Sequence, residues 1–385
     1  MDQKIQFINE WKSGEFTFQS LCEQYGISRA LGYRLCRRYE AEKEKGLLPR
    51  SRAPHTVHNK TLTEVEMALC DLRLKYKRLG ADKLLTLLRE DYGVQDLPAV
   101  STAHLILKRA GLIKPRKRFR RIVPVQPIFD PKGCDEVWSA DFKGEFRMGN
   151  GAYCYPLTIA DSYSRFVFMA KGMLRPTFDG CQAAFSEVFR TWGIPQQLHT
   201  DNGPPFGCST SLCRLTRLAV WFLELGIEPV YSDPGHPEQN GRHERMHQDL
   251  KGEATRPAAY DLRAQQRKLN AFLHFYNVVR PHDALGKKRP AKVHVPAGRP
   301  FPEKIQEWEY PKDFVERYVC RNGALRWKNN TWVGVSTALK EKRVGLEEVG
   351  EGIWRVYFRQ KPLGYFDERV RRIQDEQGRF KRNKV

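Results

Sequence analysis

The feature of the sequence that most constrains the fold is a change of pattern between about residues 135 and 282. Three segments rich in β-branched and aromatic residues, EVWSADF, YCYPLTIA and RFVFMA, are separated only by short turns containing GNG and DSYS, as in consecutive strands. Helices and strands then alternate: a helix from about Phe178 to Trp192, the strand QQLHT, a helix over 211–226, the short strand EPVY, and a long helix that begins near Gly241. This order predicts a mixed α/β sheet with helices packed on it.

The first of two helical patterns lies in residues 1–48 and predicts three short helices. The second helix runs roughly from Thr17 to Tyr25, Gly26 makes the turn, and Ser28 is a good N-cap for the third, SRALGYRLCRRYE. A helix, a glycine turn and a capped basic helix are typical of a helix-turn-helix DNA-binding domain.

The third of these helices has two faces. Leu31, Leu35 and Tyr39 recur at helical spacing and are expected to face inward. Cationic side chains remain on the outside, where we expect them to contact DNA: Arg29, Arg34, Arg37 and Arg38. A small helical bundle with a solvated basic face is the alternative.

Residues 60–112 repeat the helical pattern. Apolar spacing marks one amphipathic helix around Leu69, GADKLLTLLRE gives a second, and Ser101 caps a third that stops at Gly111. We expect a second helix-turn-helix DNA-binding domain, and after it a basic linker over 113–134. The linker residues expected to follow DNA phosphates are Lys114, Arg116, Lys117, Arg118, Arg120 and Arg121.

The C-terminal residues 318–375 return to a strand pattern. The segments ALRWKN, TWVGVS, RVGLEEV, IWRVYF and LGYFDE read as short strands with turns that hold NN, GEG and KP. Short strands at this spacing predict a small β-barrel. It could contact DNA or only protein, and the sequence leaves both open.

The charge of the chain indicates its partner. Its 385 residues include 66 Lys+Arg and 45 Asp+Glu, a formal net charge of +21, which suits nucleic acid better than an anionic membrane surface. No apolar run approaches the length of a membrane span, and the N-terminal residues are too polar for a secretion signal. The nine cysteines form no CxxC pair and no zinc-ligand pattern, so we expect reduced thiols in a cytosolic protein.

Three carboxylates stand out against this basic background. Asp141 ends the first predicted strand in WSADFKG, Asp201 follows the fourth in HTDNGPPF, and Glu244 lies in the long helix. Adjacent strands can place the two aspartates side by side, and a helix crossing that edge can bring the glutamate to them. Because close carboxylates repel one another, we expect divalent cations between them, and all-oxygen ligation suits Mg²⁺ or Mn²⁺. Two such ions can bind a scissile phosphate from both sides.

Several motifs, in this order, resemble the DDE integrase core that bacterial insertion-sequence transposases share with retroviral integrases. They are WSADFKG, DSYSRF, HTDNGPPF, the run from Pro237 to Glu244, and YNVVRPHDALGKKRP. The resemblance covers about 135–290 and implies a ribonuclease-H-like catalytic core there. It identifies Asp141, Asp201 and Glu244 as the family's catalytic, metal-binding acids.

The resemblance also implies an activity and partners. A transposase of this kind binds the terminal inverted repeats of its transposon, nicks their 3′ ends by metal-dependent hydrolysis and joins the freed 3′-hydroxyl to target DNA. It works on double-stranded DNA as a homo-oligomer, a dimer or tetramer, in the bacterial cytoplasm with the nucleoid. The alternatives are a domesticated DNA-binding protein without catalysis and a metal-dependent nuclease of the same fold.

One spacing departs from the family. The gap between Asp201 and Glu244 is longer than usual, so Glu238 is a rival for the third acid. Glu244 is preferred because Gly241 and Pro237 precede it as in the family motif. Seven residues after Glu244, on the same helix face, Lys251 is either a phosphate contact or a plain surface lysine.

Other polar residues carry weaker expectations. Asp161 is expected to hold its turn, and Asn202 with Gly203 to shape the loop that presents Asp201. Whether Arg280 and His282 pack or contact DNA is open. The histidines near the acids, which we leave as candidate phosphate contacts, are His199, His236, His243 and His247.

Overall fold

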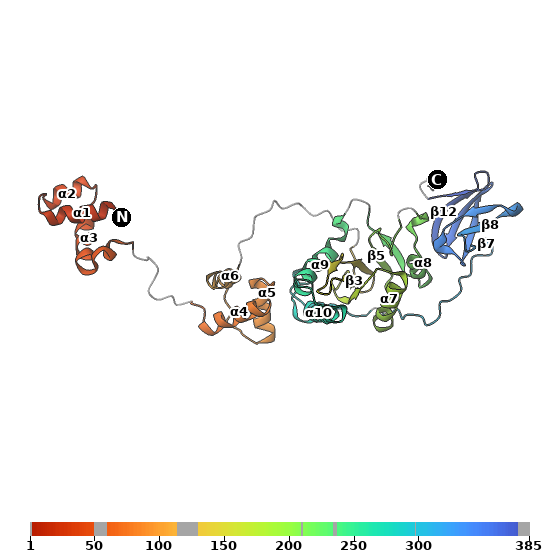
Figure 1. The fold of residues 1–385 in the computed structure, drawn as a ribbon, viewed down its shortest axis with the longest axis horizontal. Coiled ribbons are helices and arrows are strands. Elements are labelled where there is room, and N and C mark those ends of the chain that lie inside the picture. The colour runs from red at the N-terminus through yellow and green to blue at the C-terminus, as the bar shows by residue number, and fades with distance from the viewer. Residues whose placement is uncertain are drawn as a thin grey trace. The chain divides into compact units, whose positions relative to one another are not determined.

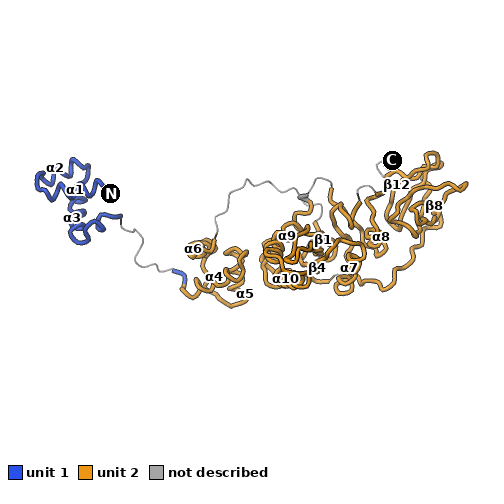
Figure 2. Tube along the Cα trace, in the orientation of Figure 1, with its two compact units in different colours: residues 1–61 blue, residues 62–385 orange. Residues whose placement is uncertain are grey.

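The computed structural model describes residues 2–49, 60–113, 130–208, 211–233, 237–296 and 298–375. The chain divides into two compact units, residues 1–61 and 62–385 (Figure 2). Within the described ranges, none of the helices combines the length and the apolar character that crossing a bilayer requires.

The first unit consists of three helices, α1 (Asp2–Ser13), α2 (Phe18–Gln24) and α3 (Arg29–Glu42), followed by the 3-10 turn η1 (Lys43–Leu47). Gly26 adopts a left-handed φ of 61°, which lets the chain turn sharply between α2 and α3. The Ser28 hydroxyl then accepts a hydrogen bond from the Leu31 amide at 3.3 Å and caps α3, as predicted. Phe7 and Leu47 close the core against these helices.

Residues 62–113 form three more helices, α4 (Thr63–Lys75), α5 (Ala81–Asp91) and α6 (Val100–Arg109) (Figure 1). The predicted Ser101 cap is wrong: α6 begins at Val100 after Ala99, and Ser101 lies inside its first turn. The connection 92–99 is longer than the turn of about three or four residues that joins a helix-turn-helix pair. A DNA-binding role for these helices therefore stays a prediction.

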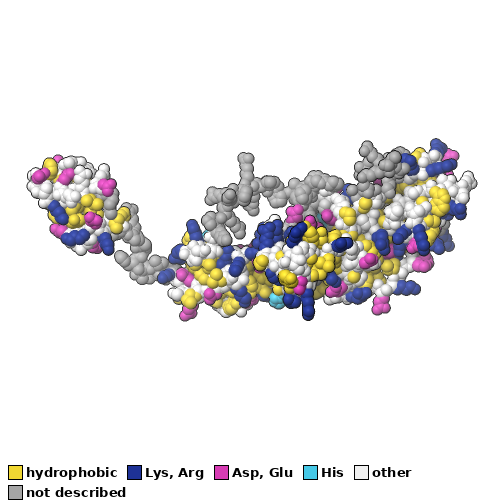
Figure 3. Space-filling model, in the orientation of Figure 1, with side chains coloured by type: hydrophobic (Ala, Val, Ile, Leu, Met, Phe, Trp, Pro, Cys, Tyr) yellow, Lys and Arg dark blue, Asp and Glu magenta, His cyan; other side chains and the backbone are white. Residues whose placement is uncertain are grey.

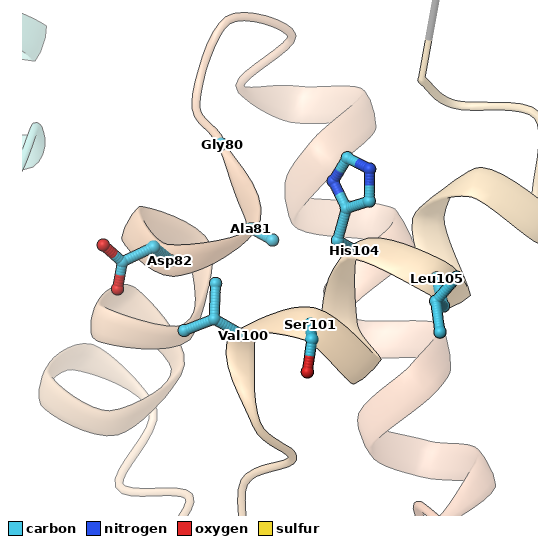
Figure 4. Close-up of a pocket in the computed structure, with 7 residues that line it drawn as sticks. All are labelled: Gly80, Ala81, Asp82, Val100, Ser101, His104 and Leu105. Atoms are coloured by element: carbon cyan, nitrogen blue, oxygen red, sulfur yellow. The ribbon is translucent and has the colours of Figure 1, made fainter.

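A shallow pocket opens between the start of α5 and α6. Gly80, Val100, Ser101, His104 and Leu105 are among the residues that line it (Figure 4). Leu105 and Val100 are exposed there, so the surface of α6 at this pocket is a mixture of apolar and polar side chains.

The central sheet has the strand order β2-β3-β1-β5-β6, with β4 paired to β3. Its strands are β1 (Val137–Phe142), β2 (Phe146–Arg147), β3 (Tyr153–Asp161), β4 (Val167–Met173), β5 (Gln197–Thr200) and β6 (Glu228–Tyr231). The pairs β1–β3, β2–β3 and β3–β4 are antiparallel, while β1–β5 and β5–β6 are parallel. The predicted mixed α/β sheet is confirmed.

Helices cover both faces of this sheet (Figure 1). Along β3, Ile159 packs with α7 (Phe178–Trp192) and α8 (Arg217–Glu224), whereas the next residue, Ala160, packs with α9 (Gly241–Ala254) and α10 (Leu262–His274). This alternation is the period of two that a strand imposes on its side chains. It puts Ser139 and Asp141 of β1 on the α9 face, since Trp138 and Ala140 belong to the other core.

The predicted helix over 211–226 is shorter in the structure. A 3-10 turn, η2 (Leu212–Arg214), precedes α8, and Cys213 within it has a left-handed φ of 49°. The Thr216 hydroxyl accepts a hydrogen bond from the Ala219 amide and starts a new helix. The conformational break explains why the apolar pattern extends further than α8 does.

Residues 62–113 contact the core near the C-terminal half of α9. The Tyr76 ring stacks on Phe275 at 5.7 Å between centroids, and Arg78 donates to the Gln248 carbonyl at 3.1 Å. Phe275 begins a π-helical turn, η4 (Phe275–Val279), which ends α10. After it come η5 (Asp283–Leu285) and α11 (Pro290–Val293).

The C-terminal region confirms the predicted strands but not the closed barrel. Five strands, in the order β13-β12-β11-β10-β7, form one antiparallel sheet, and β8 pairs only with β9 in a separate hairpin. The bounds are β7 (Val315–Tyr318), β8 (Ala324–Arg326), β9 (Trp332–Gly334), β10 (Arg343–Gly350), β11 (Ile353–Phe358), β12 (Lys361–Asp367) and β13 (Arg372–Gln374).

The hairpin is too short to close the sheet. The 3-10 turns η6 (Lys328–Asn330) and η7 (Thr337–Leu339) bound its strands, and Asn329 and Asn330 have left-handed φ values. A single isolated bridge, Val319 to Leu325, links β8 to the segment after β7, and in the described part of the chain no ladder joins β9 to β13. The region is therefore an open sheet and a hairpin around a shared core that also includes Val220 of α8.

Candidate active site

Strand register brings the two aspartates together. Strands β1 and β5 run parallel, with Ser139 opposite His199. Continuing this register by two residues on each strand sets Asp141, near the end of β1, beside Asp201, which directly follows β5. The sequence-based expectation that neighbouring strand ends would place these residues side by side agrees with the observed pairing.

The loop after β5 holds Asp201 at this edge. The Gly203 amide donates to Asp201 Oδ1 at 3.2 Å. The Asn202 side chain donates to the Ser232 carbonyl and accepts from Arg214 at 2.9 Å, which fixes the turn. Asn202 and Gly203 therefore shape the loop, as predicted.

Helix α9 crosses above the end of β1 and carries Glu244 in its first turn. Just before the helix, the Asn240 side chain donates to Asp141 Oδ2 at 3.4 Å. The Glu244 carboxylate is exposed, and its charge still acts on Asp141. The side chain of the rival, Glu238, lies outside the described part of the structure.

The pKa of Asp141 shows that other carboxylates act on this residue. Its pKa is raised from 3.8 to about 7. Desolvation is the largest cause of this rise, and the charges of Asp201 and Glu244 also contribute to it. Desolvation also raises the pKa of Asp201, against the hydrogen bond from Gly203. In the described ranges, the oxygens of the three acids do not all lie within 4.8 Å of one another, so the carboxylates do not form a compact ligand cluster in this structure.

Cations border the acids. Lys143, two residues after Asp141, is half-buried, and desolvation lowers its pKa. The charges of Lys251 and Arg256 lower it further, while Asp141 raises it. Lys143 was missed in the sequence, although it lies two residues after Asp141 in WSADFKG and directly follows β1.

A buried polar network lies directly under Asp141. Thr158 is opposite Asp141 in the β1–β3 ladder, and its hydroxyl lies 3.0 Å from the Asp141 carbonyl, to which it can donate. The Nε2 atoms of His243 and His247 each lie 2.7 Å from the same hydroxyl. His243 Nδ1 is 2.8 Å from the Ser139 hydroxyl.

Burial keeps these histidines neutral. Desolvation lowers the pKa of His247 to about 3 and that of His243 well below its usual value. His199, whose Nε2 lies 2.9 Å from the Ser232 hydroxyl, has its pKa lowered to about 4 for the same reason. The three side chains are packed inside the protein and cannot reach a DNA phosphate, so the expectation of phosphate contacts is wrong for them. His236 lies outside the described residues.

Arg280 and His282, in the segment YNVVRPHDALGKKRP, pack inside the protein. Arg280 Nη2 pairs with Asp249 Oδ2 at 2.6 Å, and both residues are buried. His282 Nε2 lies 3.2 Å from the Tyr276 carbonyl inside the fold. Of the two interpretations left open by the sequence, the structure favours packing.

Asp161 holds its turn, as expected. Its carboxylate accepts from the amides of Asp135 and Ser164 at 3.1 and 2.7 Å, and from the Ser164 hydroxyl at 2.6 Å. Ligand atoms of Asp161, Cys134 and His294 lie within 4.8 Å of one another. Because Asp161 already accepts these bonds and Cys134 Sγ accepts from the Val295 amide, hydrogen bonding alone accounts for the cluster.

The predicted DNA contacts divide into two groups. On α3, Arg29, Arg34 and Arg37 are exposed, as expected. Arg38 is half-buried and donates to the Leu48 carbonyl at 2.6 Å, because the chain after α3 folds back along the helix; its contact with DNA stays a prediction. The linker cations lie outside the described residues: Lys114, Arg116, Lys117, Arg118, Arg120 and Arg121.

Comparisons with known families agree with this architecture. The integrase core domain family matches residues 132–237 and again residues 225–290, and a helix-turn-helix domain family matches residues 3–55. These matches cover the strands, the loop and the helix that carry the three acids.

Two curated proteins illustrate the similarity. The chain is 26% identical over 236 residues to the insertion element IS476 uncharacterized 39.2 kDa protein of Xanthomonas euvesicatoria, across 58% of this chain and 62% of that protein. It is 33% identical over 128 residues to the Pro-Pol polyprotein of simian foamy virus type 1, across 32% of this chain and 10% of the polyprotein. The chain thus spans about three fifths of the bacterial relative and a tenth of the viral one.

Among solved structures, a chain of the simian T-cell lymphotropic virus intasome in complex with a PP2A regulatory subunit aligns with 76% of this chain and 97% of its own length. The TM-score is 0.38 at 16% identity. The chain therefore carries matches to an integrase core domain and to a helix-turn-helix domain, and it is similar to a protein of a bacterial insertion element.

Proposed function

We propose that the protein is a DNA transposase that binds the terminal inverted repeats of its own element. It hydrolyses a phosphodiester at each 3′ end and joins the freed 3′-hydroxyl to target DNA by transesterification. Asp141, Asp201 and Glu244 are its catalytic acids. The observation that supports this most is the β1–β5 register, which sets two aspartates at one sheet edge under the helix that carries the glutamate.

The donor set fits a divalent cation. The elevated pKa of Asp141, caused by burial and by two neighbouring carboxylates, indicates negative charge that the protein itself leaves uncompensated. Carboxylate oxygens are the ligands that Mg²⁺ and Mn²⁺ prefer, and we propose two ions per site. When bound, such ions activate the attacking oxygen and stabilise the leaving oxygen of a phosphodiester.

The cations around the acids suit the rest of the substrate. Lys143, Lys251 and Arg256 interact electrostatically at the edge of the site, and Figure 3 shows further Lys and Arg side chains over the same unit. We propose that they bind phosphates that flank the scissile bond. Each substitution that removes one of these phosphate-binding charges is expected to lower the slope of log affinity against log salt by about 0.9.

We further propose that exposed arginines of α3 bind the terminal repeat. The helices of residues 60–112 and the linker 113–134 extend this contact along the DNA. A dimer or tetramer of the protein pairs the two ends of the transposon. The support is the net charge of +21, the helix-turn-helix match and the exposure of Arg29, Arg34 and Arg37.

The central experiment mixes the full chain with a labelled terminal-repeat duplex, target DNA and Mg²⁺. Joined products are expected. Nicks without joining would instead indicate a nuclease, and a shifted but uncut duplex would indicate a binding protein.

Substitutions then assign the acids. Asp201→Asn is expected to abolish cutting while leaving the affinity for the repeat unchanged, and Glu145→Gln, which removes an exposed carboxylate after β1, is the matched control. Loss of repeat binding in Asp201→Asn would contradict the role given to this residue. Glu244→Gln and Glu238→Gln, compared in the same assay, decide between the two candidates for the third acid.

A further inference from the structure

The long gap between Asp201 and Glu244, the one spacing that departs from the integrase core motifs, contains a segment that the proposed chemistry does not use. Residues 211–216 form the turn η2 and the residue that caps α8. Apolar side chains of this segment contact the C-terminal sheet, and a cationic side chain contacts the loop that carries Asp201. The segment therefore connects the C-terminal sheet to that loop.

The turn is anchored in the C-terminal core. The side chains of Leu212 and Leu215 are buried in the apolar cluster that the C-terminal strands form. Between them, Cys213 Sγ donates to the Leu363 carbonyl of β12 at 3.2 Å. The position of the turn therefore depends on the C-terminal strands.

The backbone of the turn is held in an unfavourable conformation. Cys213 and Arg214 have left-handed φ values of 49° and 59°, in a region that residues with a β-carbon rarely adopt. Hydrogen bonds fix this conformation: the Arg214 amide donates to the Ser211 carbonyl at 3.1 Å, and the Cys208 amide donates to the Arg214 carbonyl at 3.1 Å. With its backbone fixed in this way, half-buried Arg214 reaches the Asp201 loop while its neighbours in the chain pack in the C-terminal core.

Arg214 determines how the side chain of Asn202 is oriented. Arg214 Nη1 donates to Asn202 Oδ1 at 2.9 Å and to the Ser232 carbonyl at 3.4 Å, and the Asn202 side-chain nitrogen donates to the same carbonyl. A guanidinium group donates hydrogen bonds and accepts none. Asn202 must therefore present its amide oxygen to Arg214, which leaves its nitrogen for the Ser232 carbonyl. Arg214 thus fixes the residue that directly follows Asp201.

We infer that Arg214 is a positioning residue, which holds the loop that presents the Asp201 carboxylate through Asn202, and that residues 211–216 couple this loop to the C-terminal sheet. The inference rests on the proposed function, because the position of Asp201 matters to a cation only if this residue is a ligand. Residues that orient a metal ligand typically contribute about 10- to 100-fold to metal affinity.

The charge of Arg214 acts in the opposite direction to its positioning role. A positive side chain near a metal site repels the metal ion, so removing that charge would by itself tighten cation binding. Loss of positioning would weaken it. The direction of the change in affinity therefore separates the two effects.

The test titrates Mn²⁺ alone into the full chain by calorimetry. Arg214→Gln is expected to weaken Mn²⁺ binding by about 10-fold. Arg214→Lys keeps the charge and can donate to both acceptors from one nitrogen, so it is expected to lose no more than about threefold. Unchanged or tighter Mn²⁺ binding in Arg214→Gln would overturn the inference.

A double-mutant cycle tests whether Arg214 acts through Asn202. Asn202→Ala is expected to weaken Mn²⁺ binding as Arg214→Gln does, and combining the two is expected to add less than about twofold, because the effects of residues in one hydrogen-bond network are not additive. A further 10-fold loss in the double variant would show that Arg214 acts by another route and would contradict the role given to it.

A third comparison tests the coupling to the C-terminal sheet. Leu212→Ala loosens the turn where it enters the C-terminal core and is expected to weaken Mn²⁺ binding by about threefold or more. Val344→Ala, at a fully buried position of β10 in the same core, is the matched control and is expected to leave Mn²⁺ affinity unchanged. Equal affinities in the two variants would remove the coupling.

Hydrogen exchange distinguishes positioning from a general loss of stability. In Arg214→Gln, measured by mass spectrometry, the amides of residues 201–207 are expected to exchange faster, while those of β1 and β3 keep the wild-type rates. Faster exchange throughout the central sheet would mean that Arg214 only stabilises the fold, and the inference would fail.

Controls keep the two levels distinct. Arg175→Gln, at an exposed arginine after β4, is expected to leave Mn²⁺ affinity unchanged. If Asp201→Asn binds Mn²⁺ as tightly as the wild type does, the proposed function fails. If only the Arg214 comparison fails, the proposed function stands without the positioning role.

Discussion

Removing the Asp141 carboxylate is expected to stabilise the protein while it destroys the cation site. The pKa of this group is raised from 3.8 to about 7 by burial and by the charges of Asp201 and Glu244. At about 1.4 kcal/mol per pKa unit, the ionised side chain costs the folded state about 4 kcal/mol at alkaline pH. Asn has nearly the same shape without the charge, so Asp141→Asn releases most of this cost.

The sign follows from linkage. The folded-state pKa lies above the unfolded one, so the folded state holds the proton more tightly. The stability contributed by the protonated group is complete below about pH 3.8 and is lost as the pH rises through about 7. The advantage of Asp141→Asn is therefore expected to be large at pH 8 and much smaller at pH 5, where the wild-type carboxyl is already neutral in the folded state.

The assay is urea unfolding in EDTA at pH 8 and pH 5, with wild type and variant side by side. The variant is expected to gain most in urea midpoint at pH 8, and added Mg²⁺ is expected to stabilise the wild type alone. If the variant is no more stable than the wild type at pH 8, or if it gains as much stability at pH 5 as at pH 8, the ionised Asp141 carboxylate does not destabilise the folded state and the reasoning is refuted.

Three further predictions concern the core and the ion pairs. The pKa of His199 falls from 6.5 to about 4 on folding. Between pH 7 and 5.5 this is expected to lower the free energy of unfolding by about 1.2 kcal/mol, because the unfolded chain binds the proton first; a loss of stability in acid that is no smaller in His199→Asn would contradict this. Arg280→Ala leaves Asp249 buried without its partner at 2.6 Å and is expected to cost about 3–5 kcal/mol, much of it recovered in Arg280→Met with Asp249→Leu, as measured by denaturant midpoints. Phe185→Ala, in the centre of the core under the sheet, is expected to cost about 3–5 kcal/mol in the same measurement, and a loss below about 1 kcal/mol would mean that the site collapses without a cavity.

Much of the fold could be predicted from the sequence, because capping residues and apolar periodicity indicated the same element bounds. Helix α7 begins and ends at the predicted residues, Phe178 and Trp192, since Thr177 caps it and Gly193 follows it with a positive φ. The helix over 211–226 was predicted too long because apolar periodicity continues through Cys213, whose backbone breaks the helix. Periodicity reports which side chains are buried, not whether one helix carries them.

The C-terminal region shows the same limit. The strand segments were correct, but strand composition does not say which strands pair, and β8 with β9 proved too short to close a barrel. Arg38 is a smaller case: helical spacing predicts that it faces outward, and the structure adds that the chain after α3 returns to it and accepts its hydrogen bond at the Leu48 carbonyl. Both outcomes depend on how segments fold back on one another.

By itself, the sequence determined the residue types of the candidate site, their order and the elements that carry them: an aspartate at a strand end, one in the turn after another strand, and a glutamate in a long helix. These follow from local periodicity and turn chemistry, which neighbouring residues set. Only the tertiary structure decided what lies beneath the acids. Thr158, His243 and His247 come from a strand and a helix that are 85 or more positions apart, and they meet because antiparallel register sets Thr158 opposite Asp141 while α9 packs across that face. Register and packing are properties of the assembled sheet, so no local pattern could have placed two neutral histidines under a carboxylate.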